Sequence, residues 1–178
     1  MRFLPTAIPE VLVVEPDVHR DARGFFLETY HEARYREAGI TARFVQDNHS
    51  RSARGTLRGL HAQLEPAQGK LVRCIRGEIF DVAVDARRGS PSFSRHVAVT
   101  LSGQNFRQLW IPPGFLHGFQ VLSEDAEVEY KVTALYRPEG EIAVAWNDPA
   151  LDIPWPLANP TLSERDRKAR PLDAVILH

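Results

Sequence analysis

The stretch Leu57-Arg58-Gly59-Leu60-His61-Ala62-Gln63 begins a series of short apolar segments that continues at residues 69–76 and 78–85. Runs of this length, separated by turn-forming residues, predict β-strands that are buried on at least one face. Three cationic-type side chains, Arg58, His61 and Lys70, lie inside these runs. Because burying such groups is costly, a folded protein rarely places them in strands without a use. Binding an anionic ligand beside a base and an electrostatic stabiliser is one such use.

The rest of the chain continues this pattern of short strands and turns. Further strands are predicted at residues 11–14, 24–30, 44–46, 96–101, 108–111, 117–122, 126–132 and 142–146. A polar loop is predicted at 50–55, a short helix at 31–38 and a capped helix or turn at 163–168. Many short strands with little helix predict an all-β fold, an antiparallel sandwich or jelly-roll barrel, in one domain over residues 1–178. The mouth of such a barrel is a natural small-molecule site.

Composition and charge argue against several classes of function. The net charge is −1, so no basic excess indicates nucleic acid or an anionic membrane as a partner. No run reaches the roughly 18 apolar residues of a membrane span, and residues 1–9 are too short and proline-broken for a secretory signal. Cys74 is the single cysteine, which rules out an internal disulfide and a cysteine-based zinc site. A cytoplasmic protein is therefore expected.

Five side chains are suited to acid–base chemistry at such a mouth: His61, Lys70, His117, Tyr130 and Asp166. Histidine is a competent base near neutral pH, and a carboxylate such as Asp166 would fix its tautomer. A lysine stabilises a developing oxyanion and a tyrosine on the opposite side donates a proton, a set that suits proton abstraction next to a carbonyl. The structural alternatives are a hydrogen-bonded core histidine, a lysine extending from a sheet face, a core tyrosine and a solvated aspartate.

A metal centre is a weaker alternative. Cupin-type jelly rolls bind iron, manganese or zinc through two close histidines, a nearby carboxylate and a distant histidine. Two residues after His61 this chain has Gln63 in place of the second histidine, which leaves Glu65 and His117 as the remaining candidate ligands. No metal and no cofactor are predicted.

A set of ordered motifs gives the chain its strongest resemblance. They lie at residues 21–28, 44–50, 57–61, 68–73, 80–85, 108–112, 117–119, 130–131, 146–149 and 162–166. Together they resemble the dTDP-4-dehydrorhamnose 3,5-epimerases of dTDP-L-rhamnose biosynthesis, nearly from end to end. The resemblance implies an isomerase with a metal-free, cupin-like jelly-roll fold. It would invert C3 and C5 of dTDP-4-dehydro-6-deoxy-D-glucose through an enolate, giving dTDP-4-dehydro-L-rhamnose.

The resemblance also assigns roles to individual positions. His61 matches the family's general base, Tyr130 its general acid, Asp166 the acid that partners the histidine, and Lys70 the lysine beside the keto oxygen. The positions that match substrate-binding residues are Arg23, Glu28, Gln46, Asp47, Asn48, Arg58, Lys70, His117, Glu141 and Arg165. The segment around Arg23 and Glu28 is expected to reach the neighbouring subunit's site, so the implied homodimer would complete each active site.

Three positions depart from the family pattern. Ala62 stands where many members have an aromatic residue, Glu129 precedes the tyrosine where many have an apolar one, and Arg165 replaces a common lysine. In strands, Ala62 and Glu129 would point away from His61 and Tyr130. The alternatives left open are a monoepimerase that acts at C3 or C5 only, a non-catalytic nucleotide-sugar-binding cupin, and a metal-dependent cupin oxygenase.

Overall fold

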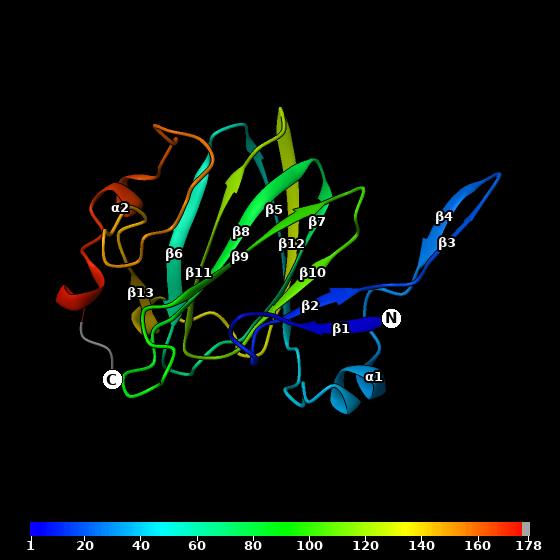
Figure 1. Ribbon diagram of the computed structural model, residues 1–178, viewed down its shortest axis with the longest axis horizontal. Helices are drawn as coiled ribbons and strands as arrows, with labels where there is room; N and C mark the ends of the chain where they lie inside the picture. The colour runs from blue at the N-terminus through cyan, green and yellow to red at the C-terminus, as the bar shows by residue number, and fades with distance from the viewer. Residues whose placement is uncertain (176–178) are drawn as a thin grey trace.

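Short antiparallel strands form two facing sheets in the computed structural model, which describes residues 1–175 (Figure 1). The six-stranded sheet has the order β1 (Arg2–Pro5), β2 (Leu12–Glu15), β10 (Gln108–Ile111), β7 (Lys70–Arg76), β12 (Asp125–Val132) and β5 (Gln46–Ala53). The five-stranded sheet has the order β13 (Glu141–Ala143), β6 (Leu57–Gln63), β11 (Phe115–Val121), β8 (Glu78–Asp85) and β9 (His96–Ser102). This architecture confirms the predicted all-β jelly-roll class.

Helices are few and short, as predicted. They are α1 (Glu32–Glu37), α2 (Glu164–Arg167) and the 3₁₀ turns η1 (Pro138–Gly140) and η2 (Leu172–Ala174). Among residues 1–175, no helix is long and apolar enough to cross a bilayer. A separate hairpin of β3 (Val18–Asp21) and β4 (Gly24–Leu27) extends away from the two sheets (Figure 1).

Side chains alternate between the two faces of each strand, and this alternation builds three apolar clusters. On β11, Phe115, Phe119 and Val121 face the main core between the sheets, while Leu116 packs on the outer face. The C-terminal segment covers that outer face, and α1 covers the outer face of the six-stranded sheet through Tyr35. Polar residues at inward positions are therefore exceptions to the pattern, and several of them gather around one cavity.

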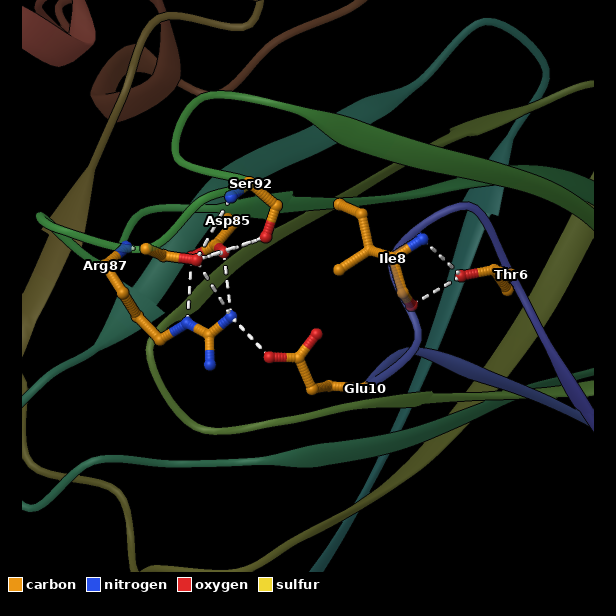
Figure 2. A network of polar contacts seen from close by, with 7 residues as sticks. Thr6, Ile8, Glu10, Asp85, Arg87 and Ser92 are labelled. Atoms are coloured by element: carbon orange, nitrogen blue, oxygen red, sulfur yellow. Dashed lines mark hydrogen bonds and ion pairs between the residues drawn. The ribbon is translucent and has the colours of Figure 1, made fainter.

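A dense polar network ties together two loops beside the main core (Figure 2). The fully buried Asp85 carboxylate accepts hydrogen bonds from the Arg87 backbone and guanidinium and from the hydroxyls of Ser90 and Ser92. Arg87 also donates to Glu10 at 3.0 Å, and its guanidinium lies 4.6 Å from the centre of the Phe115 ring. The network therefore joins the end of β8 to the N-terminal loop.

Strand β5 corrects one prediction. Residues 50–55 were predicted as a polar loop, but β5 continues to Ala53. Its polar character reflects two different surfaces, because Gln46, Asn48 and Ser50 line the cavity while the alternate residues face outward. The outward Arg51 pairs with Asp125 of β12, so charge pairing across the strands replaces apolar burial.

The strand predicted at 24–30 ends at Leu27, and the strand predicted at 44–46 begins only at Gln46, but several other boundaries agree closely with the sequence pattern. The strands predicted at 57–63, 78–85 and 108–111 match β6, β8 and β10, and α1 lies inside the predicted helix. The strand predicted at 142–146 is shorter, ending at Ala143. Strands β1 and β3 were not predicted, because β1 ends in proline and β3 is mostly exposed and charged.

Candidate active site

A cavity of about 580 Å³ is lined by strands of both sheets and by the segment that leads into α2. Nine of the predicted site residues lie around it: Gln46, Asn48, Arg58, His61, Lys70, His117, Tyr130, Glu141 and Asp166. They come from β5, β6, β7, β11, β12, β13 and α2. The fold thus brings together residues that are far apart in the sequence.

His61 and Asp166 form a hydrogen-bonded pair at this cavity. Nε2 of His61 lies 2.6 Å from Oδ1 of Asp166, which is 4% exposed. Ser163 caps α2 by accepting a hydrogen bond from the Asp166 backbone, which fixes the aspartate in the first turn. Burial by itself raises the pKa of Asp166, but the bond to His61, its charge, and the bonds from Ser163 and the Gly59 backbone hold the pKa below its usual value. An ionised carboxylate therefore orients the imidazole through Nε2.

Two glycines allow the strand that carries His61 to pack closely against β11. Gly59 has a φ of +127°, and a Cβ there would lie 2.6 Å from the Gly118 Cα. Any side chain at Gly59 would therefore push the two strands apart. In the register of β6 and β11, His61 stands opposite His117, so this close approach sets how both rings enter the cavity.

Lys70 is a buried cation next to His61. It begins β7, is 8% exposed, and its Nζ donates to the His61 carbonyl at 3.3 Å. Burial lowers the pKa of Lys70 to about 8, although Glu141 and Asp81 act in the opposite direction. A desolvated ammonium of this kind interacts strongly with any negative charge that develops in the cavity.

Tyr130 lies on β12, in the sheet opposite to the one that carries His61. Burial raises the pKa of Tyr130; Arg58 opposes this effect, and Glu141 and Tyr136 add to it. The phenol therefore remains protonated at neutral pH. Two proton-transfer groups thus enter the cavity from opposite sheets, which is the arrangement that inversion at a carbon atom requires.

A second histidine–aspartate pair lies deeper. Nε2 of His117 is 2.7 Å from Oδ1 of Asp81, and both residues are buried. Within residues 1–175, the other Asp81 oxygen has no hydrogen-bond partner. Sequence reasoning placed His117 among the ligand-binding residues but gave Asp81 no role. The available signal was a single carboxylate inside the otherwise apolar strand 79–84.

Polar residues form the rim of the cavity. Nε of Arg58 donates to Ser52 at 2.9 Å, and the exposed guanidinium is held beside the opening. Glu141 accepts from Tyr136 at 3.0 Å and pairs with Arg165, which brings Arg165 to the same rim. Tyr136 lines the cavity and was not singled out from the sequence.

Three predicted residues lie outside the cavity. Arg23 is on the β3–β4 hairpin, where it pairs with Asp21, and Glu28 follows β4 and pairs with Arg34. Asp47 faces outward on β5 and pairs with Lys131. Within one subunit, this chain does not bring these three residues to its own cavity.

The candidate metal ligands do not form a cluster. Gln63 uses its amide to hold neighbouring backbone, and Glu65 is exposed in a turn outside the cavity lining. No group of three or more histidine, cysteine, aspartate or glutamate residues suited to a metal was found in the described part of the chain. The prediction that the protein carries no metal remains to be tested by elemental analysis.

Comparison with known proteins points to one family. A family model described as dTDP-4-dehydrorhamnose 3,5-epimerase matches residues 5–174. The dTDP-4-dehydrorhamnose 3,5-epimerase of Pseudomonas aeruginosa is 57% identical, covering 96% of this chain and 95% of its own length.

Two solved structures share both the fold and much of the sequence. The dTDP-6-deoxy-D-glucose-3,5-epimerase of Legionella pneumophila, in complex with dTDP-4-keto-L-rhamnose, has a TM-score of 0.96 and 51% identity, with 98% of this chain and 94% of that chain covered. A 3'-monoepimerase from Streptomyces bikiniensis, in complex with dTDP-quinovose, has a TM-score of 0.89 and 35% identity, with coverage of 95% and 87%.

Proposed function

The chain belongs to the dTDP-4-dehydrorhamnose 3,5-epimerase family, and we propose that it inverts C3 and C5 of dTDP-4-dehydro-6-deoxy-D-glucose with the residues around its cavity. The product is dTDP-4-dehydro-L-rhamnose, the 4-keto sugar used in dTDP-L-rhamnose biosynthesis. The observation that carries the assignment of residues is the His61–Asp166 pair, which faces Tyr130 across a cavity that also holds the buried Lys70.

The chemistry follows from the position of the keto group. C3 and C5 both flank the C4 carbonyl, so loss of either proton gives an enolate. His61 removes the proton from one face, and Asp166 stabilises the imidazolium that forms. Tyr130 then delivers a proton to the opposite face, which inverts the carbon, and proton exchange with solvent returns His61 and Tyr130 to their starting states before the second carbon reacts. The oxidation state of the sugar does not change, so the isomerisation is balanced by proton transfers alone.

Charged groups would stabilise the intermediate and hold the substrate. The Lys70 ammonium lies within the cavity and would stabilise negative charge on the C4 oxygen. Arg58, whose guanidinium is exposed at the opening, is suited to grip the diphosphate, as Arg23 of a second subunit would be. The rim residues Gln46, Asn48, Glu141 and Arg165, and the deeper His117, are proposed to bind other polar groups of the substrate.

Solvent exchange tests this proposal. When the protein is incubated with dTDP-4-dehydro-6-deoxy-D-glucose in deuterated water, deuterium should enter at both C3 and C5, as read by NMR. Exchange at neither carbon would refute the proposed function. Binding of the nucleotide sugar without turnover, and with the same affinity after His61→Ala, would instead support a non-catalytic binding module.

A monoepimerase is the second candidate, because a 3'-monoepimerase shares this fold at 35% identity. Ala62 and Glu129, the two departures beside His61 and Tyr130, do not favour it. Ala62 packs in the cluster outside the five-stranded sheet, and Glu129 pairs with Arg73 at 2.6 Å. Neither residue lines the cavity. Deuterium at a single carbon would establish this alternative.

We also propose a homodimer in which the β3–β4 hairpin completes the site of the other subunit. Phe25 and Phe26 are 56% and 71% exposed, a large apolar surface for a projecting hairpin, and Arg23 on the same hairpin lies outside its own cavity. The nucleotide substrate is a charged molecule that does not cross membranes unaided, which supports cytoplasmic action.

Mixing two inactive variants tests the shared site. Arg23→Ala and His61→Asn should each have little activity alone. If the hairpin acts across the dimer, a mixed dimer contains one intact site, so a statistical mixture should recover about a quarter of wild-type activity. No recovery after subunit exchange, or a monomer in solution by light scattering, would contradict the shared site.

A further inference from the structure

Three glutamine amides hold one exposed segment, residues 133–137, at the rim of the cavity. Gln63 Nε2 donates to the Leu135 carbonyl at 3.0 Å, and its Oε1 accepts from the Arg137 backbone N–H at 2.7 Å. Gln68 donates to the Ala134 carbonyl at 2.7 Å, and Gln46 accepts from the Tyr136 backbone N–H at 3.1 Å. The segment lies between β12 and η1 and has no ladder of its own, so these amides supply its missing partners.

The side chains of Leu135, Tyr136 and Arg137 in this segment are exposed although its backbone is held. Leu135 is 61% exposed and Tyr136 is 51% exposed. The Tyr136 ring lines the cavity, and its hydroxyl donates to Glu141 at 3.0 Å. The ring is therefore fixed at both ends while its surface stays available. A rigid aromatic surface at a cavity rim is a favourable contact for the outer part of a ligand.

Gln63 is the central member of this clamp. It lies two residues after His61 on the same face of β6, and it is 2% exposed. Both of its amide hydrogens are used, one on Leu135 and one on the Pro66 carbonyl at 2.9 Å. The side chain consequently has little capacity left to bind a ligand directly, and its contacts are with the protein.

We propose that Gln63 is a positioning residue for substrate binding, which fixes residues 133–137 and the Tyr136 ring before the ligand arrives. The identity of the ligand rests on the proposed function. A segment that is already ordered loses less conformational entropy on binding, so the clamp should contribute to affinity and hardly at all to the chemical step.

Gln120 provides a matched control. It is fully buried, its Nε2 donates to the Leu157 carbonyl at 2.8 Å, and its Oε1 accepts from the Leu157 backbone N–H at 2.9 Å. It therefore makes the same kind of amide–backbone bonds as Gln63. It does not line the cavity.

The experiment compares Gln63→Met with Gln120→Met. Both variants should melt at lower temperature, but only Gln63→Met should bind dTDP about tenfold more weakly by titration calorimetry and raise KM by a similar factor, with kcat within about twofold of wild type. Wild-type dTDP affinity in Gln63→Met, or an equal loss in Gln120→Met, would overturn the proposal.

A second variant covers the case in which Gln63→Met does not fold. Gln68→Met removes the bond to Ala134 only and should weaken dTDP binding by about threefold, whereas unchanged affinity would count against the clamp. The dTDP titration requires no turnover. A wild-type protein that binds dTDP but exchanges no deuterium would therefore refute the proposed function and still allow the clamp to be judged.

Discussion

Two buried carboxylates, Asp85 and Asp166, are built for opposite purposes. Asp85 accepts five hydrogen bonds, three from Arg87 and one each from Ser90 and Ser92 (Figure 2). Asp166 has fewer partners among residues 1–175: the His61 ring at 2.6 Å is the main one, and Ser163 and the Gly59 backbone add to it. Both carboxyl groups have a lowered pKa, for different reasons. Burial raises each pKa, but at Asp85 the five donors outweigh this effect, and at Asp166 the titratable His61 ring is the main group that outweighs it.

The difference shows how this fold separates stability from chemistry. A saturated carboxylate has no capacity to respond to a change in its neighbour, so the Asp85 network can only join loops. Within residues 1–175, groups at the cavity are incompletely paired: Lys70 makes one long hydrogen bond, and one Asp81 oxygen has no partner. Such incompletely satisfied groups are costly to bury and are typical of functional sites.

Asp85→Asn should have the largest effect, on stability. Removing the charge from a buried and fully paired site should cost about 3 kcal/mol, while kcat and KM below the melting temperature stay close to wild type. A lowered carboxylate pKa adds stability at pH values above that of the unfolded chain and loses it as pH falls. The stability of Asp85→Asn should therefore depend less on pH between 5 and 2. Chemical denaturation as a function of pH measures both the loss of stability and its pH dependence. Loss of turnover with unchanged stability would contradict a purely structural role for Asp85.

Asp166→Asn should have the next largest effect, on turnover. The amide retains a hydrogen bond to His61 but cannot stabilise the imidazolium, so kcat should fall by about 10²-fold, or ~2.7 kcal/mol, with KM within about twofold. Steady-state kinetics separate the effect on kcat from the effect on KM, and a thermal melt of the same sample shows whether the variant is still folded. Unchanged turnover would remove Asp166 from the mechanism.

Lys70 should give the reaction an alkaline limit. Because the pKa of Lys70 is lowered to about 8, the ammonium is lost as pH rises through that value. If the cation stabilises the enolate, kcat/KM should fall about tenfold per pH unit above 8. In Lys70→Met, activity should be low, and the fall in kcat/KM above pH 8 should be absent. A wild-type profile that stays flat from pH 7 to 10 would contradict the assigned role.

Ser92→Ala should have the smallest effect. It removes one of the five donors to Asp85, so stability should fall by about 1 kcal/mol, or roughly 2–4 °C in melting temperature. Turnover should not change. A loss of stability as large as that of Asp85→Asn would show that the network depends mainly on this one hydroxyl and not on all five donors together.

The sequence predicted more of the cavity than of its surroundings. His61, Lys70 and Tyr130 could be found because strands 57–63, 69–76 and 126–132 have clear boundaries and alternation, and ordered motifs assigned their roles. Polar β5 was partly missed, because its inner face lines a polar cavity and its outer face forms charge pairs with β12. The contacts of Gln63 with residues 135–137 and the pairing of Asp81 with His117 join distant segments, which no local pattern contains.

Solvent deuterium exchange in the Tyr130→Phe and His61→Asn variants separates the two proposed proton transfers most directly. With Tyr130→Phe, the base can still remove a proton and return deuterium to the same face, so recovered substrate should carry deuterium at C3 and C5 without inversion. With His61→Asn, neither exchange nor inversion should occur. Inversion at the wild-type rate in Tyr130→Phe, or exchange at the wild-type rate in His61→Asn, would contradict a mechanism with one base and one acid on opposite faces of the sugar.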